Sequence, residues 1–261
     1  MADEEEAGEP GRRSPGQGGL LDTPTLKARL GELERRLEEG GSGAGGEPPP
    51  GEEAATEYCQ QLCQTLLEYA EKWKASEDPL PLLEVYTEAI QSYIKAQPYL
   101  TSESENVALV LERLALSYVE ILLCLPLELP ENKWKEIQSF IQTAHEKLMQ
   151  SGNSQFQFLS LLAQENGAWK NPVLCGILSQ ELQDQDKVNE FLAFEGSVLL
   201  DMRIKHLMKS KQLTQATALA KVCSDHPEIS SKGSFKQTYL VCLCSGSPNE
   251  KLMQEVLQHA W

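Results

Sequence analysis

From Glu52 onward the apolar residues recur at intervals of three and four, a spacing that places them on one face of an α-helix. We find no convincing alternation of apolar and polar residues, which a half-buried β-strand would show. The first stripe, widened by Cys59, Cys63 and Ala70, consists of Tyr58, Leu62, Leu66, Tyr69 and Trp73. The pattern therefore predicts an all-α fold.

Prolines and capping residues divide this pattern into separate helices. Ser102 and Glu105 form a capping box, and Asn171 is a cap followed by Pro172 at the first helical position. Helices are predicted over residues 58–73, 82–97, 102–124, 131–149, 156–163, 171–178, 188–194, 197–209, 214–223, 235–244 and 249–259. Because the connections are short, we expect sequential helices to pack as antiparallel hairpins.

The segment LLEVYTEAIQSYIKAQPYL has the small residue, the aromatic residues and the terminal proline typical of the second helix of a tetratricopeptide-type unit. A second segment, HLMKSKQLTQATALAKVCSDHP, has a similar helix-turn-helix rhythm. No strict 34-residue period links them. We therefore predict a degenerate tetratricopeptide-like α-solenoid over residues 52–261, and the alternative is an irregular helical domain.

The N-terminal part has a different composition. Residues 1–22 are acidic and rich in Gly and Pro, so they cannot offset their ordering entropy by burial and we expect disorder. Leucines at 26, 30, 33 and 37 then predict a short helix over residues 23–39. Two heptads interrupted by Gly31 are too short to hold a coiled coil alone, so this helix is either solvated and frayed or a docking or dimerising segment. Residues 40–51, GGSGAGGEPPPG, have the composition of a linker.

Charge and cysteine content narrow the functional classes. The 261 residues carry a formal net charge of −16. We therefore expect no autonomous nucleic-acid binding, because each phosphate contact needs a positive charge. The start of the chain lacks the features of an export signal, and the seven cysteines indicate a reducing compartment. Glu112, Arg113 and Glu120 make the most apolar run, Val107 to Leu127, a buried helix and not a membrane span.

No motif supports catalysis or metal binding. His145 and Glu146 begin an H-E-x-x-H pattern, but Met149 stands where the second histidine is needed. Cys59 with Cys63 and Cys242 with Cys244 lack further ligands at finger spacing, so we interpret these four cysteines as core residues. The basic residues between Arg203 and Lys211 predict a solvated helix face. We therefore expect no enzyme activity and no cofactor.

The chain resembles the N-terminal region of the large zinc finger proteins of the Rlf, 292 and 654 family over about residues 54–257. The resemblance lies in YCQQLCQTLLEYAEKW (58–73), LLEVYTEAIQSYIKAQPYLT (82–101), WKNPVL (169–174), DMRIKHL (201–207) and FKQTYLVCLCS (235–245). It implies a tetratricopeptide-like helical region of a nuclear protein that acts in RNA polymerase II transcription.

One feature separates this chain from that family. It holds no C-x2–4-C…H-x3–5-H finger, so zinc and direct DNA binding are implied only for a full-length relative. The ending EVLQHAW suggests a truncated or alternatively spliced product. On that interpretation the last helices expose apolar side chains such as Leu252, Val256 and Trp261, and the chain self-associates.

We therefore predict a non-catalytic protein-interaction module of a nuclear transcription regulator. The alternative is a cytosolic helical scaffold or adaptor. Stacked helix pairs create a concave face that holds a segment of another protein, and the acidic balance favours a Lys- or Arg-rich segment. The first helices of two pairs, which begin near Glu52 and Asn106, are expected to line it. The candidate partner-binding residues are Gln60, Gln64, Glu68, Glu112 and Arg113.

Overall fold

The computed structural model describes residues 23–41, 52–73, 80–100, 105–126, 128–164, 167–181 and 184–245. Within these ranges every regular element is a helix, which confirms the all-α class. The α-helices are α1 (Thr23–Gly41), α2 (Glu52–Trp73), α3 (Leu80–Ala96), α4 (Glu105–Leu123), α5 (Glu131–Gln150), α6 (Leu159–Gln164), α7 (Pro172–Leu178), α8 (Gln185–Lys209), α9 (Leu213–Asp225), α10 (Pro227–Lys232) and α11 (Phe235–Ser245). Two 3₁₀ turns are η1 (Gln97–Tyr99) and η2 (Ser154–Phe156).

The capping prediction at Asn171 is confirmed in atomic detail. The Asn171 side chain accepts hydrogen bonds from the backbone N–H groups of Val173 and Leu174, at 2.9 and 3.2 Å. Pro172, which has no N–H to donate, occupies the first turn of α7. Local sequence alone therefore accounts for the start of this helix.

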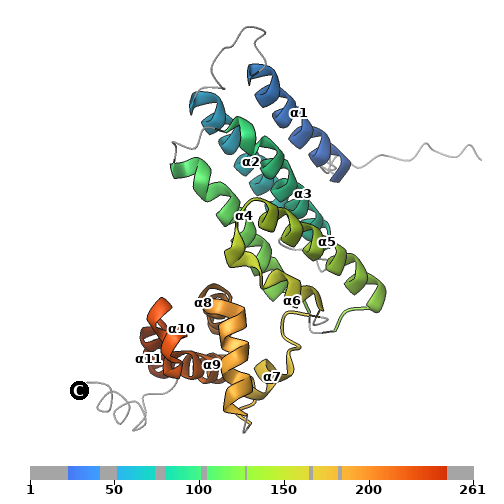
Figure 1. Cartoon of the computed structure of the whole chain (residues 1–261). Coiled ribbons are helices and arrows are strands. Elements are labelled where there is room, and N and C mark those ends of the chain that lie inside the picture. Colours follow the sequence, from blue (N-terminus) through green and yellow to red (C-terminus); the bar gives the residue numbers. More distant parts are fainter. Residues whose placement is uncertain are drawn as a thin grey trace, which may run out of the picture.

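Helices α1 to α6 share the first hydrophobic core (Figure 1). α3 is central, since it contacts α1, α2, α4 and α5, while α1 also contacts α2, and α2 contacts α4. α1, α3 and α5 thus form one row and α2 and α4 a second. α5 packs mainly on α3 and α6 and barely touches α4, so the expected hairpin of sequential neighbours does not form at that step. The helices stack, while tetratricopeptide-type regularity stays a prediction.

The leucine helix differs from the solvated, frayed helix considered above. Leu26, Leu30 and Leu37 of α1 are buried, and α1 packs along α2 and α3. Ion pairs fix its flanks to both neighbours, with Arg29 bound to Glu68 of α2 and Lys27 bound to Glu88 of α3. The leucine stripe is therefore part of the main core and is not free to form a separate coiled coil.

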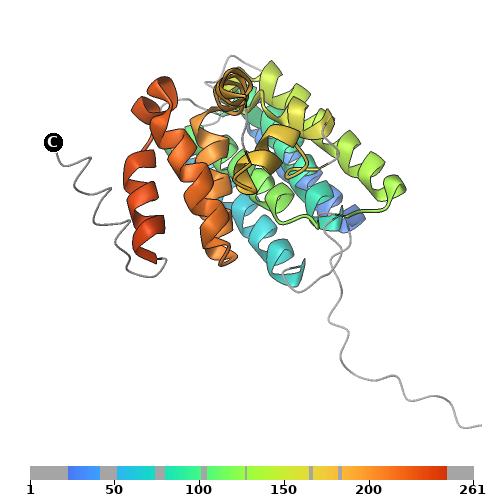
Figure 2. The ribbon, with the colours of Figure 1, turned by 90° about the horizontal axis from the view of Figure 1, so that it is seen from below.

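Helices α7 to α11 enclose a second, smaller core. α9 lies at its centre and packs against α7, α8, α10 and α11 (Figure 2). The two cores meet along α8, where Leu199 and Met202 pack with the first core and Leu200 and Ile204 with the second. No described helix is both long enough and apolar enough to cross a bilayer.

Several predicted segments lie outside the described residues. These are residues 1–22, residues 42–51 of the linker predicted over 40–51, Ser102 of the predicted capping box, and the helix predicted over residues 249–259 with Leu252, Val256 and Trp261.

Candidate protein-interaction surface

Helices α2 and α4 contact each other in the first core, and each has an exposed side. Partial burial raises the pKa of the Cys63 thiol on α2, and the guanidinium of Arg113 on α4 opposes that rise. Arg113 of α4 therefore lies near Cys63 of α2. Tyr86 of α3 lies near both helices. Burial raises the pKa of its hydroxyl, the hydrogen bond with Ser117 of α4 opposes that rise, and Cys63 of α2 adds to it.

The five residues predicted to bind a partner differ in how exposed they are. Gln60 and Gln64 of α2 and Glu112 and Arg113 of α4 are exposed. Glu68 is only partly exposed, and its carboxylate is bound to the Arg29 guanidinium of α1 at 2.9 Å.

Three of these residues, Gln60, Gln64 and Glu68, follow one another at intervals of four along α2, which places them on one side of the helix. The Gln64 side chain donates to the Glu68 carboxylate at 3.3 Å. That the five residues bind a partner stays a prediction.

Two exposed leucines were missed by the sequence interpretation. The exposed fraction is 59% for Leu67 of α2 and 43% for Leu109 of α4. A helical-wheel check could have found Leu67, because it lies opposite the buried stripe of Leu62, Leu66 and Tyr69. These two leucines leave apolar surface in contact with solvent on two helices that contact each other.

The cysteines fall into two groups. Cys59, Cys223 and Cys242 are buried, whereas Cys63, Cys124, Cys175 and Cys244 are exposed. The interpretation of Cys63 and Cys244 as core residues is therefore wrong. Burial raises the pKa of the Cys59 thiol to about 11 and raises that of Cys223 still further. Among the described residues, no three His, Cys, Asp or Glu side chains are grouped as metal ligands would be.

The basic run from Arg203 to Lys211 is only partly a solvated face. Arg203 is fully buried, and its Nη2 and Nε atoms donate to the Glu195 carboxylate at 2.6 and 2.8 Å. Lys205 and Lys209 are exposed and are paired with Asp201 and Glu120. The sequence pattern predicted that Arg203 faces solvent, whereas its charged side chain lies on the buried face of α8.

The junction between the cores centres on Trp169. Its indole Nε1 donates to the Leu123 carbonyl at 2.9 Å, and the Arg203 guanidinium lies 5.2 Å from its ring centroid. Arg203 also donates to the Ala168 carbonyl. The His206 ring is tilted against that of Trp169, with the ring centroids 5.4 Å apart, and its Nδ1 lies 3.9 Å from the Cys124 Sγ.

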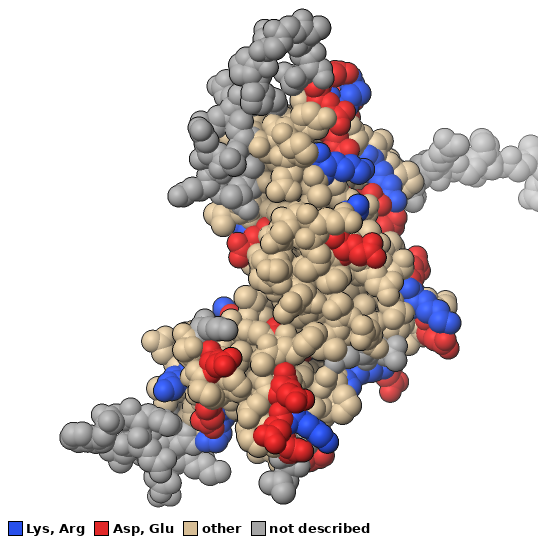
Figure 3. Space-filling model, in the orientation of Figure 1, with Lys and Arg blue, Asp and Glu red and all other residues tan. Residues whose placement is uncertain are grey.

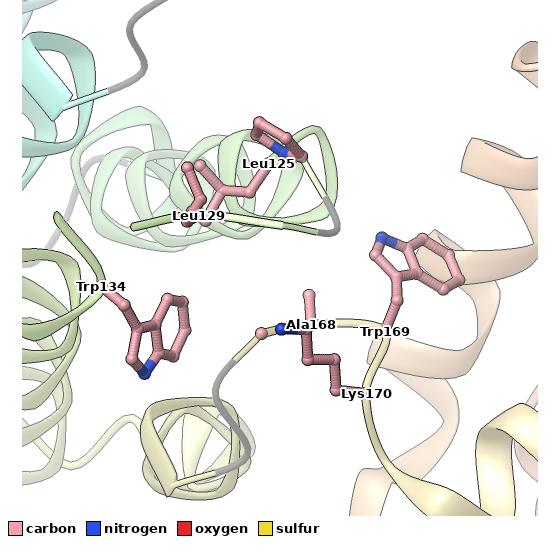
Figure 4. A pocket seen from close by; sticks show the side chains of 8 residues that line it. Leu125, Leu129, Trp134, Ala168, Trp169 and Lys170 are labelled. Atoms are coloured by element: carbon pink, nitrogen blue, oxygen red, sulfur yellow. The ribbon is translucent and has the colours of Figure 1, made fainter. Parts of the chain in front are cut away.

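A small pocket lies beside this junction, and Trp169 is one of the residues that line it (Figure 4). Its wall is mainly apolar and includes Leu125, Leu129, Trp134, Ala168 and Lys170. Lys170 is the single ionisable residue of this wall, so the pocket brings together no pair of acid, base or nucleophile as catalysis usually needs. Nothing in the described residues points to an enzyme.

Charged side chains gather over α1 in the view of Figure 3, while the middle of that face carries few. The α1 charges are largely paired with one another. Arg35 and Arg36 both bind Glu32, and Arg35 also binds Glu39. These groups are accordingly less available to a partner than Glu112 and Arg113 on α4, for which the described residues provide no ion pair.

Two comparisons gave no match, since no protein-family profile and no solved structure is similar to this chain. Known sequences are similar. The chain is 68% identical over 257 residues to zinc finger protein 292 of Homo sapiens and 66% identical over 256 residues to that of Mus musculus. It is 31% identical over 205 residues to zinc finger protein 654 of Mus musculus.

The coverage of these alignments is unequal. They include 98% of this chain for zinc finger protein 292 and 78% for zinc finger protein 654. The chain spans only 9% of the length of zinc finger protein 292 and 18% of that of zinc finger protein 654. The resemblance predicted from the sequence is confirmed.

Proposed function

This chain is related to zinc finger proteins 292 and 654, and from that premise we propose that it is a non-catalytic protein-binding module of a nuclear regulator of RNA polymerase II transcription. Its own sequence contains no zinc finger motif. DNA recognition and zinc then belong to other parts of a full-length relative, and this helical stack supplies contacts with proteins.

The observation that carries the binding role is the pair of exposed leucines, Leu67 and Leu109, on the adjacent helices α2 and α4. Full burial of one leucine side chain is worth about 1.5–3 kcal/mol relative to leaving it in water. A partner that covers both would gain part of that free energy for each. Gln60, Glu112 and Arg113 provide hydrogen bonds and charges around them.

The partner that fits this chain best is a protein segment rich in Lys or Arg. With a net charge of −16 the chain attracts such a segment at long range, and complementary charge mainly raises the association rate and the specificity. Glu112 can bind a basic side chain directly. The runner-up function is a cytosolic scaffold or adaptor that uses the same surface.

Affinity capture with matched variants tests the proposal. The double variant Gln60→Lys/Leu67→Asp alters the α2 face. The control Gln142→Lys/Phe194→Asp makes similar changes at exposed residues of α5 and α8. We expect proteins captured from nuclear extract by the natural chain to be lost with the α2 variant and kept with the control.

Circular dichroism and thermal unfolding would establish that both variants fold. Equal capture by both variants would exclude this surface as the binding site. Capture that depends on the α2 face but occurs only from cytosolic extract would favour the scaffold function.

A further inference from the structure

The exposed stripe of α4 is symmetric about its centre. From Leu109 to Leu116 the outward positions are a leucine, Glu112, Arg113 and a second leucine, with two residues between each leucine and the nearer charge. At 100° per residue, these four side chains lie within an arc of about 100° on the helix surface. The order leucine, charged residue, charged residue, leucine is the same in both directions along the helix. The two charges differ in sign, since one is an acid and the other a base.

These side chains are available to a partner. Leu109 is 43% exposed, Leu116 is partly buried, and Glu112 and Arg113 are both exposed. Within the described part of the chain, neither charge has an ion-pair partner. By contrast, Glu120, two turns beyond Glu112 on the same helix, is paired with Lys209.

We propose that this stripe binds a second copy of the same chain, with the two α4 helices antiparallel about a twofold axis. A twofold interface uses the same patch on both copies, so the patch must be complementary to itself. In this arrangement Leu109 of each copy faces Leu116 of the other, and Glu112 of each faces Arg113 of the other. Two ion pairs and two leucine pairs form at once.

α2 extends the interface. α2 packs against α4, and its exposed residues Cys63 and Leu67 lie one turn apart on the same side of α2, beside the helix that carries the stripe. Stable interfaces bury about 1,200–2,000 Å² in total, and one helix pair with this flank lies at the low end. The net charge of −16 per chain adds repulsion. The dimer is therefore weak and forms at tens of micromolar or above.

This inference rests on the proposed function in one respect, because both require the α2–α4 face to be an interface. The test of self-association changes only α4, whereas the capture experiment changes only α2. If the chain is monomeric but capture still depends on α2, only the self-association is wrong. If the dimer forms and capture does not depend on α2, only the proposed function is wrong.

Sedimentation equilibrium of the full chain from about 1 to about 200 µM tests the dimer. The natural chain is expected to approach twice the monomer mass at the upper end. Arg113→Glu places like charges opposite each other and should weaken the dimer at least ~10-fold, as should Glu112→Arg. The exchange Glu112→Arg/Arg113→Glu restores complementary pairs and should recover dimerisation.

The matched control is Phe194→Asp, which places a charge at an exposed apolar residue of α8 and should leave the mass unchanged. Far-ultraviolet circular dichroism verifies that each variant is folded. A natural chain that is monomeric throughout would overturn the proposal. So would single variants that dimerise as well as the natural chain, or a charge exchange that is folded and does not recover the dimer.

Discussion

Glu195 and Arg203 form a fully buried ion pair within α8, on opposite sides of the glycine that interrupts the helix. Both oxygens of the Glu195 carboxylate accept from the guanidinium, which also donates to the Ala168 carbonyl and stacks on Trp169. The Arg203 side chain thus connects the two halves of α8 with Ala168 and Trp169, in the segment between the two cores.

Loss of one member of this pair should be costly. Arg203→Met leaves the Glu195 carboxylate buried without its cation, and we expect the free energy of unfolding to fall by about 3–5 kcal/mol. The double variant Glu195→Met/Arg203→Met removes both charges and should be more stable than the single variant, although it still lacks the bond to Ala168. Urea unfolding measures both, and a double variant no more stable than Arg203→Met would contradict this account.

Gly196 permits the break in α8. Its φ of 74° and ψ of 165° belong to a region that is almost exclusive to glycine. An added Cβ would meet no atom within 4 Å, so the cost of Gly196→Ala is conformational strain and not a steric clash. We expect a loss of about 1–3 kcal/mol in thermal or urea unfolding.

The control for that variant is Gly31→Ala in α1. Its added Cβ also meets nothing within 4 Å, but Gly31 lies inside a regular helix. There alanine should stabilise the chain by about 0.5–1 kcal/mol. If both variants shifted stability in the same direction, backbone conformation would not be the deciding factor.

The thiols should react with an aromatic disulfide reagent in two classes. Cys63, Cys124, Cys175 and Cys244 are exposed and should react in the folded chain, while Cys59, Cys223 and Cys242 should require unfolding. Burial raises the pKa of Cys63 and Cys124, so these two should react more slowly than a free thiol at neutral pH. Mass spectrometry of the labelled peptides would identify each class, and early labelling of Cys223 would show that the second core opens readily.

His206 should make stability depend on pH. Burial, and then the nearby Lys209 charge, lower its pKa below the usual 6.5, while Glu120 opposes the shift. The unfolded chain therefore binds the His206 proton more readily than the folded chain does. The contribution of His206 to the free energy of unfolding falls as the pH decreases from above 6.5 through the lowered pKa of the folded state. Stability should thus decrease over that window.

The variant His206→Gln isolates this contribution. The difference in unfolding free energy between the natural chain and His206→Gln should change between pH 8 and pH 5, in the direction that favours the variant at low pH. Other titrating groups cancel in the difference. An equal difference at both pH values would mean that His206 does not sense its surroundings as described.

The sequence predicts only in part which residues of the candidate surface are exposed and free of contacts. Gln60, Glu112 and Arg113 lie off the apolar stripes, and helical periodicity alone predicts that such residues face solvent. Glu68 follows the same rule, yet Arg29 of α1 binds it. No local pattern indicates that contact, because the two residues are separated by a linker and meet only when α1 packs on α2.

The sequence by itself determined the helices and much of the core of this protein. Apolar spacing of three and four, the Asn171 cap and the prolines are local signals, and each acts within a few residues of the backbone it directs. The tertiary structure decided what those signals leave open. The leucines of α1 are covered by α2 and α3, Arg203 is buried against Glu195 and Trp169, and Leu67 and Leu109 remain exposed. The burial of a side chain depends on which surface packs over it, and that surface comes from residues distant in the chain.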